Sequence, residues 1–102
     1  MLFRSQRHWG DSDCIGGIPS PVDSLKTLRF DAGLGVQQPG FCPEFGEHVT
    51  IDSVMRIWGD VDCDDDIGPV DSLKILRFDA GLEVEQPVSC PDVGATVELL
   101  LV

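Results

Sequence analysis

Apolar residues recur with helical spacing in two segments of the chain. In the second segment two such series are interleaved: Leu73, Leu76 and Ala80, and Ile75, Phe78 and Leu82. The pattern predicts a helix from about Asp71 to about Ala80, which Gly81 ends in a left-handed cap. The segment from Asp23 to Gly33 repeats the pattern and predicts a first helix. We expect the apolar side chains to be core, and the helices to pack together because neither repeat can bury its helix face alone.

The two helices belong to two copies of one unit, residues 9–49 and 58–97. With a single one-residue gap, 26 of 40 aligned positions are identical. The chain therefore divides into a non-native or linker tail at 1–8, a first loop-helix repeat at 9–49, a connector at 50–57, and a second loop-helix repeat with an apolar C-terminal segment at 58–102.

This division predicts one small, mainly α domain: two loop-helix repeats with packed helices and short extended connectors. Residues 49–51 and 97–102 follow equivalent Cys-Pro turns in the two copies. Their apolar character suits either short strands or covers over the helix pair.

The chain is strongly acidic, with a formal net charge of −11 over 102 residues. Because no basic patch can neutralise phosphates, we expect no binding to nucleic acid or to anionic membrane. No apolar run is long enough to span a membrane. A chain of this length has little room for a catalytic cleft, and no nucleophile-base pair is evident, so we do not expect an enzyme. The charge suits cations.

The acids gather in the loops that precede the predicted helices. If Asp60 is position 1 of a twelve-residue loop, carboxylates occupy positions 1, 3, 5, 7 and 12: Asp60, Asp62, Asp64, Asp66 and Asp71. Calcium takes six to eight oxygens, which such a loop supplies from positions 1, 3 and 5, the carbonyl of 7, water at 9 and a bidentate carboxylate at 12. We expect Ile67 at position 8 to tether the loop to the core. We expect Asp65 at position 6 to take the left-handed conformation usually given to Gly. A solvated acidic loop is the alternative, but the spacing favours a calcium site.

The first loop offers a smaller set of candidate ligands, Asp11, Asp13 and Asp23. Ile15 replaces the carboxylate of position 5, and one inserted residue makes Asp23 the thirteenth residue of the loop. Fewer charged ligands predict weaker affinity. The loop either holds calcium at millimolar levels or is a structural loop stiffened by proline.

Four cysteines in a short chain are typical of a disulfide framework in an oxidising compartment. Of the three possible connectivities, the duplication favours Cys14–Cys42 and Cys63–Cys90, one bridge within each repeat. A zinc site is the rival interpretation. The thiols lack CxxC spacing, however, and His8 and His48 are the only histidines.

The paired pattern resembles type I dockerins, which consist of two repeats of an EF-hand-like calcium loop followed by a helix. The resemblance covers residues 9–34 and 58–82, and most of it lies in GDVDCDDDIGPVDSLKILR, residues 59–77. It implies calcium-dependent folding and binding to a cohesin domain, a contact that joins secreted or surface proteins into assemblies that often act on polysaccharides. It also implies partner-binding residues at loop positions 10 and 11 and along the helices: Pro69, Val70, Lys74 and Arg77, with Pro21, Val22, Lys26 and Arg29 as counterparts.

We therefore expect a calcium-binding interaction module of a secreted or cell-surface protein, with a cohesin-type partner. The alternative is a calcium-stabilised structural repeat or spacer that self-associates. The first nine residues lack the apolar region of a signal peptide, so we expect an internal piece of a longer secreted chain. Trp9 and Trp58 stand at the same place before each loop. We expect them to be core anchors beneath the loops rather than platforms for carbohydrate.

Overall fold

The computed structural model describes residues 3–101. The elements follow the order β1 (Phe3–His8), α1 (Pro21–Asp31), β2 (His48–Ile51), β3 (Val54–Ile57), α2 (Pro69–Asp79) and β4 (Thr96–Leu101). Met1 and Leu2, assigned above to the tail, and Val102, assigned to the C-terminal segment, lie outside the described residues.

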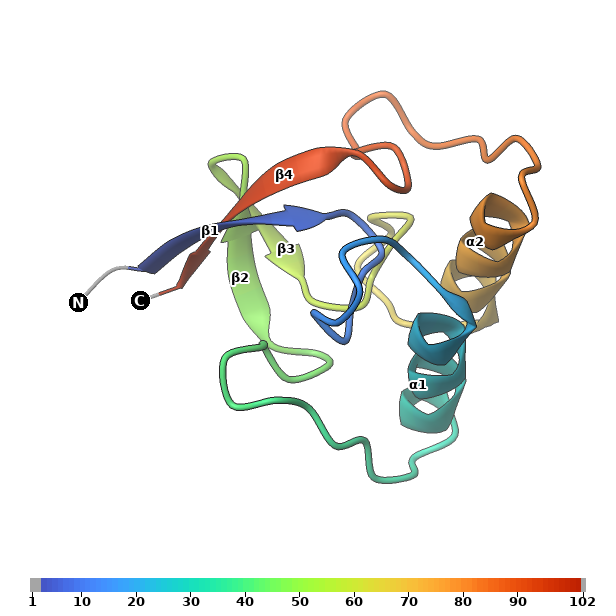
Figure 1. Ribbon diagram of the computed structural model, residues 1–102, viewed down its shortest axis with the longest axis horizontal. Helices are drawn as coiled ribbons and strands as arrows, with labels where there is room; N and C mark the ends of the chain where they lie inside the picture. Colours follow the sequence, from blue (N-terminus) through green and yellow to red (C-terminus); the bar gives the residue numbers. More distant parts are fainter. Residues whose placement is uncertain (1–2, 102) are drawn as a thin grey trace.

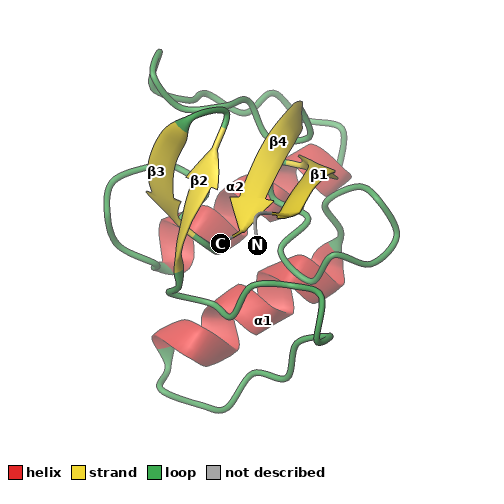
Figure 2. Cartoon of the chain, turned by 90° about the vertical axis from the view of Figure 1, so that its left-hand side faces the viewer, coloured by secondary structure: helices red, strands yellow, loops and turns green. Residues whose placement is uncertain are grey.

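The four strands form one antiparallel sheet in the order β1-β4-β2-β3. Both helices lie on the same side of this sheet (Figures 1 and 2). The expectation of a mainly α domain is therefore wrong: the chain is a small α/β domain. Residues 49–51 and 97–99 carry the pattern that indicates strands. Val49, Ile51, Val97 and Leu99 are buried and alternate with more exposed residues. Period-two alternation is the pattern of a half-buried strand, so both segments are strands and not covers over the helices.

Strand pairing joins the ends and the middle of the chain. Strand β1, within the segment assigned to the tail, pairs with β4 from Phe3↔Leu101 to His8↔Thr96. The connector contains β3, which pairs with β2 across a turn where Asp52 and Ser53 have φ of 48° and 70°. The Asp52 carboxylate accepts the Glu98 amide at 2.8 Å and so ties this turn to β4. These contacts link residues far apart in the chain, and a helical repeat pattern does not predict them.

Both helices begin two residues before the predicted start and end one residue before the predicted last position, with Ala32 and Ala80 as C-caps. Pro21 and Pro69 open them at the first helical position, where a missing amide costs nothing. At the other end Gly33 and Gly81 have φ of 77° and 76°. The Leu82 amide donates to the carbonyl of Arg77, which satisfies a carbonyl that the helix leaves free. The left-handed cap at Gly81 is confirmed.

The helices pack against each other as expected, through small residues. Ser24 and Ser72 occupy equivalent positions, and their hydroxyls hydrogen-bond to each other across the interface. Because equivalent residues of the two helices contact each other, we infer that an approximate twofold axis relates the repeats.

The core lies between the sheet, the two tryptophans and the buried side of α2, where Ile75 is fully buried. The core prediction is wrong for five leucines and one phenylalanine. The exposed fractions are 57%, 42%, 55%, 43%, 53% and 38% for Leu25, Leu28, Leu73, Leu76, Leu82 and Phe30. The buried side of α2 consists of Asp71, Ser72 and Ile75, because the loop and the other helix cover that side. The helix pair therefore presents an apolar face to solvent.

Candidate metal centres

The second loop brings four of its five candidate carboxylates together. Single oxygens of Asp60, Asp62, Asp64 and Asp71 all lie within 4.8 Å of one another. Asp60 and Asp71 are each only 1% exposed, whereas Asp64 lies at the surface. The side chains come from loop positions 1, 3, 5 and 12, so the loop and the first turn of α2 build the cluster together.

Backbone amides shape this cluster. The Asp71 carboxylate accepts the Asp62 amide at 3.0 Å and the Gly68 amide at 2.8 Å, which closes the loop onto the start of α2. Asp60 accepts the Asp65 amide at 2.9 Å. Asp65 has φ of 70°, and Ile67 is buried beneath the loop, so both expectations for these positions are confirmed.

Asp66 lies outside the cluster. Its side chain is exposed, and its amide donates to Asp64 at 3.1 Å. At loop position 7, therefore, only the backbone carbonyl of Asp66 remains as a candidate ligand.

The first loop builds a smaller and more deeply buried cluster. Oxygens of Asp11, Asp13 and Asp23 lie within 4.8 Å of one another, and the side chains are 2%, 3% and 0% exposed. The Asp23 carboxylate accepts the Asp13 amide at 2.9 Å and the Ser20 amide at 2.7 Å, as its counterpart Asp71 does. The Oδ1 atom of Asp11 is buried without a hydrogen-bond partner among the described residues. Buried polar atoms normally have partners, so this oxygen is available as a ligand to a cation.

The inserted residue of the first loop changes which side chain tethers it. Pro19 is fully buried, while Ile18 is exposed. Pro19 therefore fills the place that Ile67 has in the second loop, and the aligned isoleucine turns outward.

Burial dominates the electrostatics of both clusters. It raises the pKa of Asp60 to about 8, and those of Asp11, Asp23 and Asp71 to about 7. Burial also acts upward on the pKa of Asp62, but hydrogen bonds from Asp60, Asp71 and Asp64 outweigh it and lower that pKa. Near neutral pH these raised pKa values favour protonated carboxyls, which a cation would have to deprotonate in order to bind. Both clusters could hold metal ions.

The cysteines form two disulfides, Cys14–Cys42 and Cys63–Cys90. This is the pairing that the duplication favours. Each bridge ties loop position 4 to the segment after the helix. None of the cysteines is free, so the thiol ligands that a zinc site needs are not available.

A contact that the sequence did not reveal joins the two loops. The Trp9 indole donates to the Val61 carbonyl at 2.8 Å, and the Trp58 indole donates to the Ser12 carbonyl at 2.9 Å. Both carbonyls belong to position 2 of the opposite repeat's loop. The rings are 2% exposed and meet edge to face with centroids 6.4 Å apart, so the expected role as core anchors is confirmed. In the sequence, only the duplicated position of the two tryptophans pointed to these reciprocal hydrogen bonds between the repeats.

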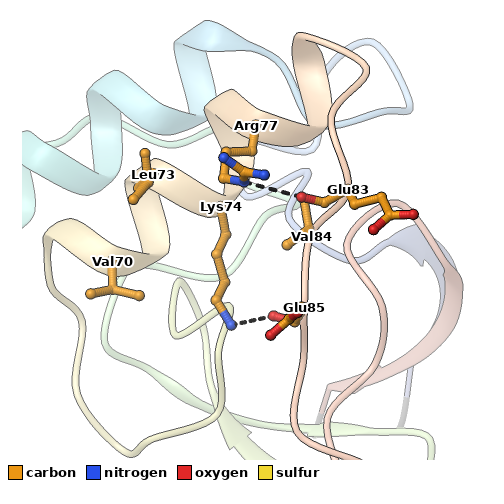
Figure 3. Close-up of a pocket in the computed structure, with 7 residues that line it drawn as sticks. All are labelled: Val70, Leu73, Lys74, Arg77, Glu83, Val84 and Glu85. Atoms are coloured by element: carbon orange, nitrogen blue, oxygen red, sulfur yellow. Dashed lines mark hydrogen bonds between the residues drawn. The ribbon is translucent and has the colours of Figure 1, made fainter.

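Six of the eight residues implied to bind a partner line two grooves. Each groove runs between a helix and the extended segment that follows it. We name them the α1 groove, with a volume of about 560 Å³, and the α2 groove, with about 400 Å³. The α1 groove is lined by Val22, Leu25, Lys26, Arg29, Gly35, Val36 and Gln37. The α2 groove is lined by Val70, Leu73, Lys74, Arg77, Glu83, Val84 and Glu85 (Figure 3). Pro21 and Pro69 are exposed at the helix starts but line neither groove.

The groove cations also hold the groove together. Lys74 donates to the Glu85 carbonyl at 2.6 Å, and Arg77 donates to the Glu83 carbonyl at 3.0 Å (Figure 3). Lys26 and Arg29 make the equivalent bonds in the first repeat. Part of each cation's donor capacity is therefore used inside the molecule.

Comparison of the chain with protein-family models, with curated proteins and with solved structures gave no match. Among the described residues, neither helix has the length and apolar character needed to cross a membrane.

Proposed function

We propose that this protein binds calcium in the second loop and, with fewer ligands, in the first. The convergence of the Asp60, Asp62, Asp64 and Asp71 oxygens within 4.8 Å carries the proposal. The donor set consists only of oxygen, which suits a hard cation, and the spacing 1, 3, 5 and 12 is that of a twelve-residue calcium loop. The buried, unpaired oxygen of Asp11 supports a cation in the first loop as well.

We also propose that the calcium-loaded protein is an interaction module that binds another protein through its helix pair. Exposed leucines and valines of α1 and α2 lie beside four of the seven Lys and Arg residues of the chain. A contiguous apolar surface on a small domain is typical of a binding face. The sequence resemblance to dockerins makes a cohesin-type domain the first partner to test. Two disulfides are consistent with an extracellular location, and we propose a secreted or cell-surface parent protein.

Calorimetric titration of the chelator-treated protein with calcium tests the ion site. We expect saturable heat that chelator reverses, together with a change in tryptophan fluorescence because both rings contact the loops. The absence of any saturable, reversible change at millimolar calcium would disprove the calcium proposal.

Pull-down with purified cohesin domains, in calcium and in chelator, tests the partner. Light scattering of the protein alone belongs beside it. Calcium-dependent capture supports the interaction module. Calcium-dependent assembly of the protein alone, without capture, would instead support a self-associating structural spacer.

A further inference from the structure

The helix walls of the two grooves are almost the same. The helices read PVDSLKTLRFD and PVDSLKILRFD and differ only at Thr27 and Ile75. Both of these residues are 0% exposed, so the difference lies inside the molecule. A partner that contacted only the helices would meet the same surface in either repeat.

The opposite walls are not the same. Gly35 and Gln37 line the α1 groove where Glu83 and Glu85 line the α2 groove. Each helix contributes one lysine and one arginine, so the α1 groove holds two cations and no acid, whereas the α2 groove holds two of each. In both grooves the lysine and the arginine donate to neutral backbone carbonyls, so these bonds do not distinguish the grooves. The charge difference comes from the Glu83 and Glu85 side chains, which the α1 groove replaces with Gly35 and Gln37.

The loops before the helices differ in the same direction. The first loop exposes Ile15 and Ile18, whereas the second exposes Asp64, Asp65 and Asp66. Charges closer than the Debye length, about 10 Å at ordinary ionic strength, still act on a docking partner. The α1 groove and the loop before it therefore offer apolar and positive side chains, whereas the α2 groove and its loop add carboxylates.

We infer that the α1 groove, and not its near-copy beside α2, is the preferred seat for an acidic protein surface that presents an apolar side chain next to a carboxylate. The apolar part packs on Val22 and Leu25, and the carboxylate lies near Lys26 and Arg29. The inference rests on the proposed interaction function and deepens it, because an unequal pair of grooves fixes the orientation in which a partner docks.

The test uses two defined peptides, acetyl-Glu-Leu-Leu-Glu-amide and its uncharged counterpart acetyl-Gln-Leu-Leu-Gln-amide. Each is titrated into ¹⁵N-labelled protein with intact disulfides and excess calcium. Amide shifts of Val22 and Leu25 report on the α1 groove, and those of Val70 and Leu73 report on the α2 groove. We expect the acidic peptide to bind the α1 groove with a dissociation constant lower by about threefold, an effect that salt removes. The uncharged peptide is expected to show no preference.

Exchanging the walls provides matched variants. G35E/Q37E copies the α2 wall into the α1 groove and is expected to remove the preference. A Cβ added at Gly35 meets no atom within 4 Å, so this change fits the fold. E83G/E85Q makes the reverse exchange and is expected to bring the α2 groove to the affinity of the α1 groove.

Equal affinity of the two grooves in the unmodified protein would overturn the inference, as would a preference for the α2 groove. A preference that survives both wall exchanges, or no groove-specific shift with the acidic peptide, would do the same. Because the peptides need no cohesin, these results are independent of the pull-down that tests the interaction function itself.

Discussion

The carboxylate of Asp71 takes part in three structures at once. It accepts the Gly68 amide at the start of α2, accepts the Asp62 amide from across the loop, and lies among the converging oxygens. Helix start, loop closure and ion site therefore share one residue. Its sequence position alone indicated this, because position 12 is both the last loop ligand and part of the first helical turn.

Replacing Asp71 by Asn tests the ligand role. We expect calcium affinity of the second loop to fall by at least about tenfold, the lower end of the cost of losing a group that supports a metal. Calorimetry measures it. Asp66→Asn removes the same charge from the same loop, but its carboxylate lies outside the cluster, so its affinity should stay within a few-fold of the unmodified protein. Equal losses in the two variants would show that only net charge matters.

The raised pKa values predict opposite pH responses with and without calcium. Asp11, Asp23 and Asp71 have pKa values of about 7, and Asp60 of about 8, against an ordinary value of 3.8. Between pH 4 and 8 the folded, calcium-free protein thus holds more protons than the unfolded chain, and its stability falls as pH rises. The lowered pKa of Asp62 acts only below this window.

Thermal unfolding in chelator should therefore give a lower Tm at pH 8 than at pH 5. Calcium binds the deprotonated carboxylates, so its affinity should weaken as pH falls from 8 to 6. A Tm in chelator that rises from pH 5 to 8 would contradict the burial of these groups.

At the scale of elements, helical spacing located α1 and α2 but not their buried sides. Apolar periodicity normally marks the core side of a helix. Here the core receives Ile75, while the leucines of the same helix remain at the surface. Ser72, Asp71 and the packed α1 helix occupy the rest of the buried side. The exposed leucines therefore contribute surface rather than core, and they are the apolar part of the proposed binding face.

A pair of truncations on α2 separates these roles. Ile75→Ala should lower the free energy of unfolding by about 2–5 kcal/mol because it leaves a cavity in the core. Leu73→Ala should change it by less than about 0.5 kcal/mol because more than half of this residue is already exposed. Urea unfolding measures both. Similar losses would mean that Leu73 is not at the surface.

Each disulfide joins an acidic loop to the extended segment after the helix, and the first part of that segment lines a groove. Removing one with C63S/C90S should cost roughly 3–4 kcal/mol, as expected for a bridge that closes a segment of this length. The comparison is urea unfolding beside C14S/C42S, which spans nearly the same separation, 28 against 27 residues. A cost near zero for both would show that the loops hold their shape without the bridges.

At the scale of the molecule, the repeats are one folding unit. Strand β1 precedes the first repeat and pairs with β4 at the end of the second, and each tryptophan bonds the other repeat's loop. The unfolding of either repeat would therefore break hydrogen bonds and core contacts of the other.

We therefore expect a single unfolding transition, detected at the same denaturant concentration by circular dichroism and by tryptophan fluorescence. Trp58→Phe keeps an aromatic side chain, smaller than the indole, but loses the hydrogen bond to the Ser12 carbonyl, and it should lower the free energy of unfolding by about 1–3 kcal/mol. Trp9→Phe loses the equivalent bond to Val61 and should cost about the same. Two separated transitions would show that the exchanged contacts do not couple the repeats.

Much of this protein follows from local sequence. The duplication, the two helices with their caps, the loop positions of the aspartates and the pairing of the cysteines are all readable from spacing, because each depends on residues close together in the chain or on the copy of a unit. The left-handed Asp65 and the buried Ile67 belong to the same class.

Only tertiary structure decided the rest. The sheet joins segments from both ends and the middle, and its short strands carry a period-two pattern too brief to outweigh the helical repeats. Which side of each helix is buried depends on what packs against it, and that partner lies 48 residues away at the Ser24–Ser72 contact. The hydrogen bond of each tryptophan indole and the burial of the Asp11 oxygen, which has no partner among the described residues, likewise depend on the tertiary structure. Local pattern specifies what a segment can form, whereas burial and pairing depend on long-range neighbours that no local pattern contains.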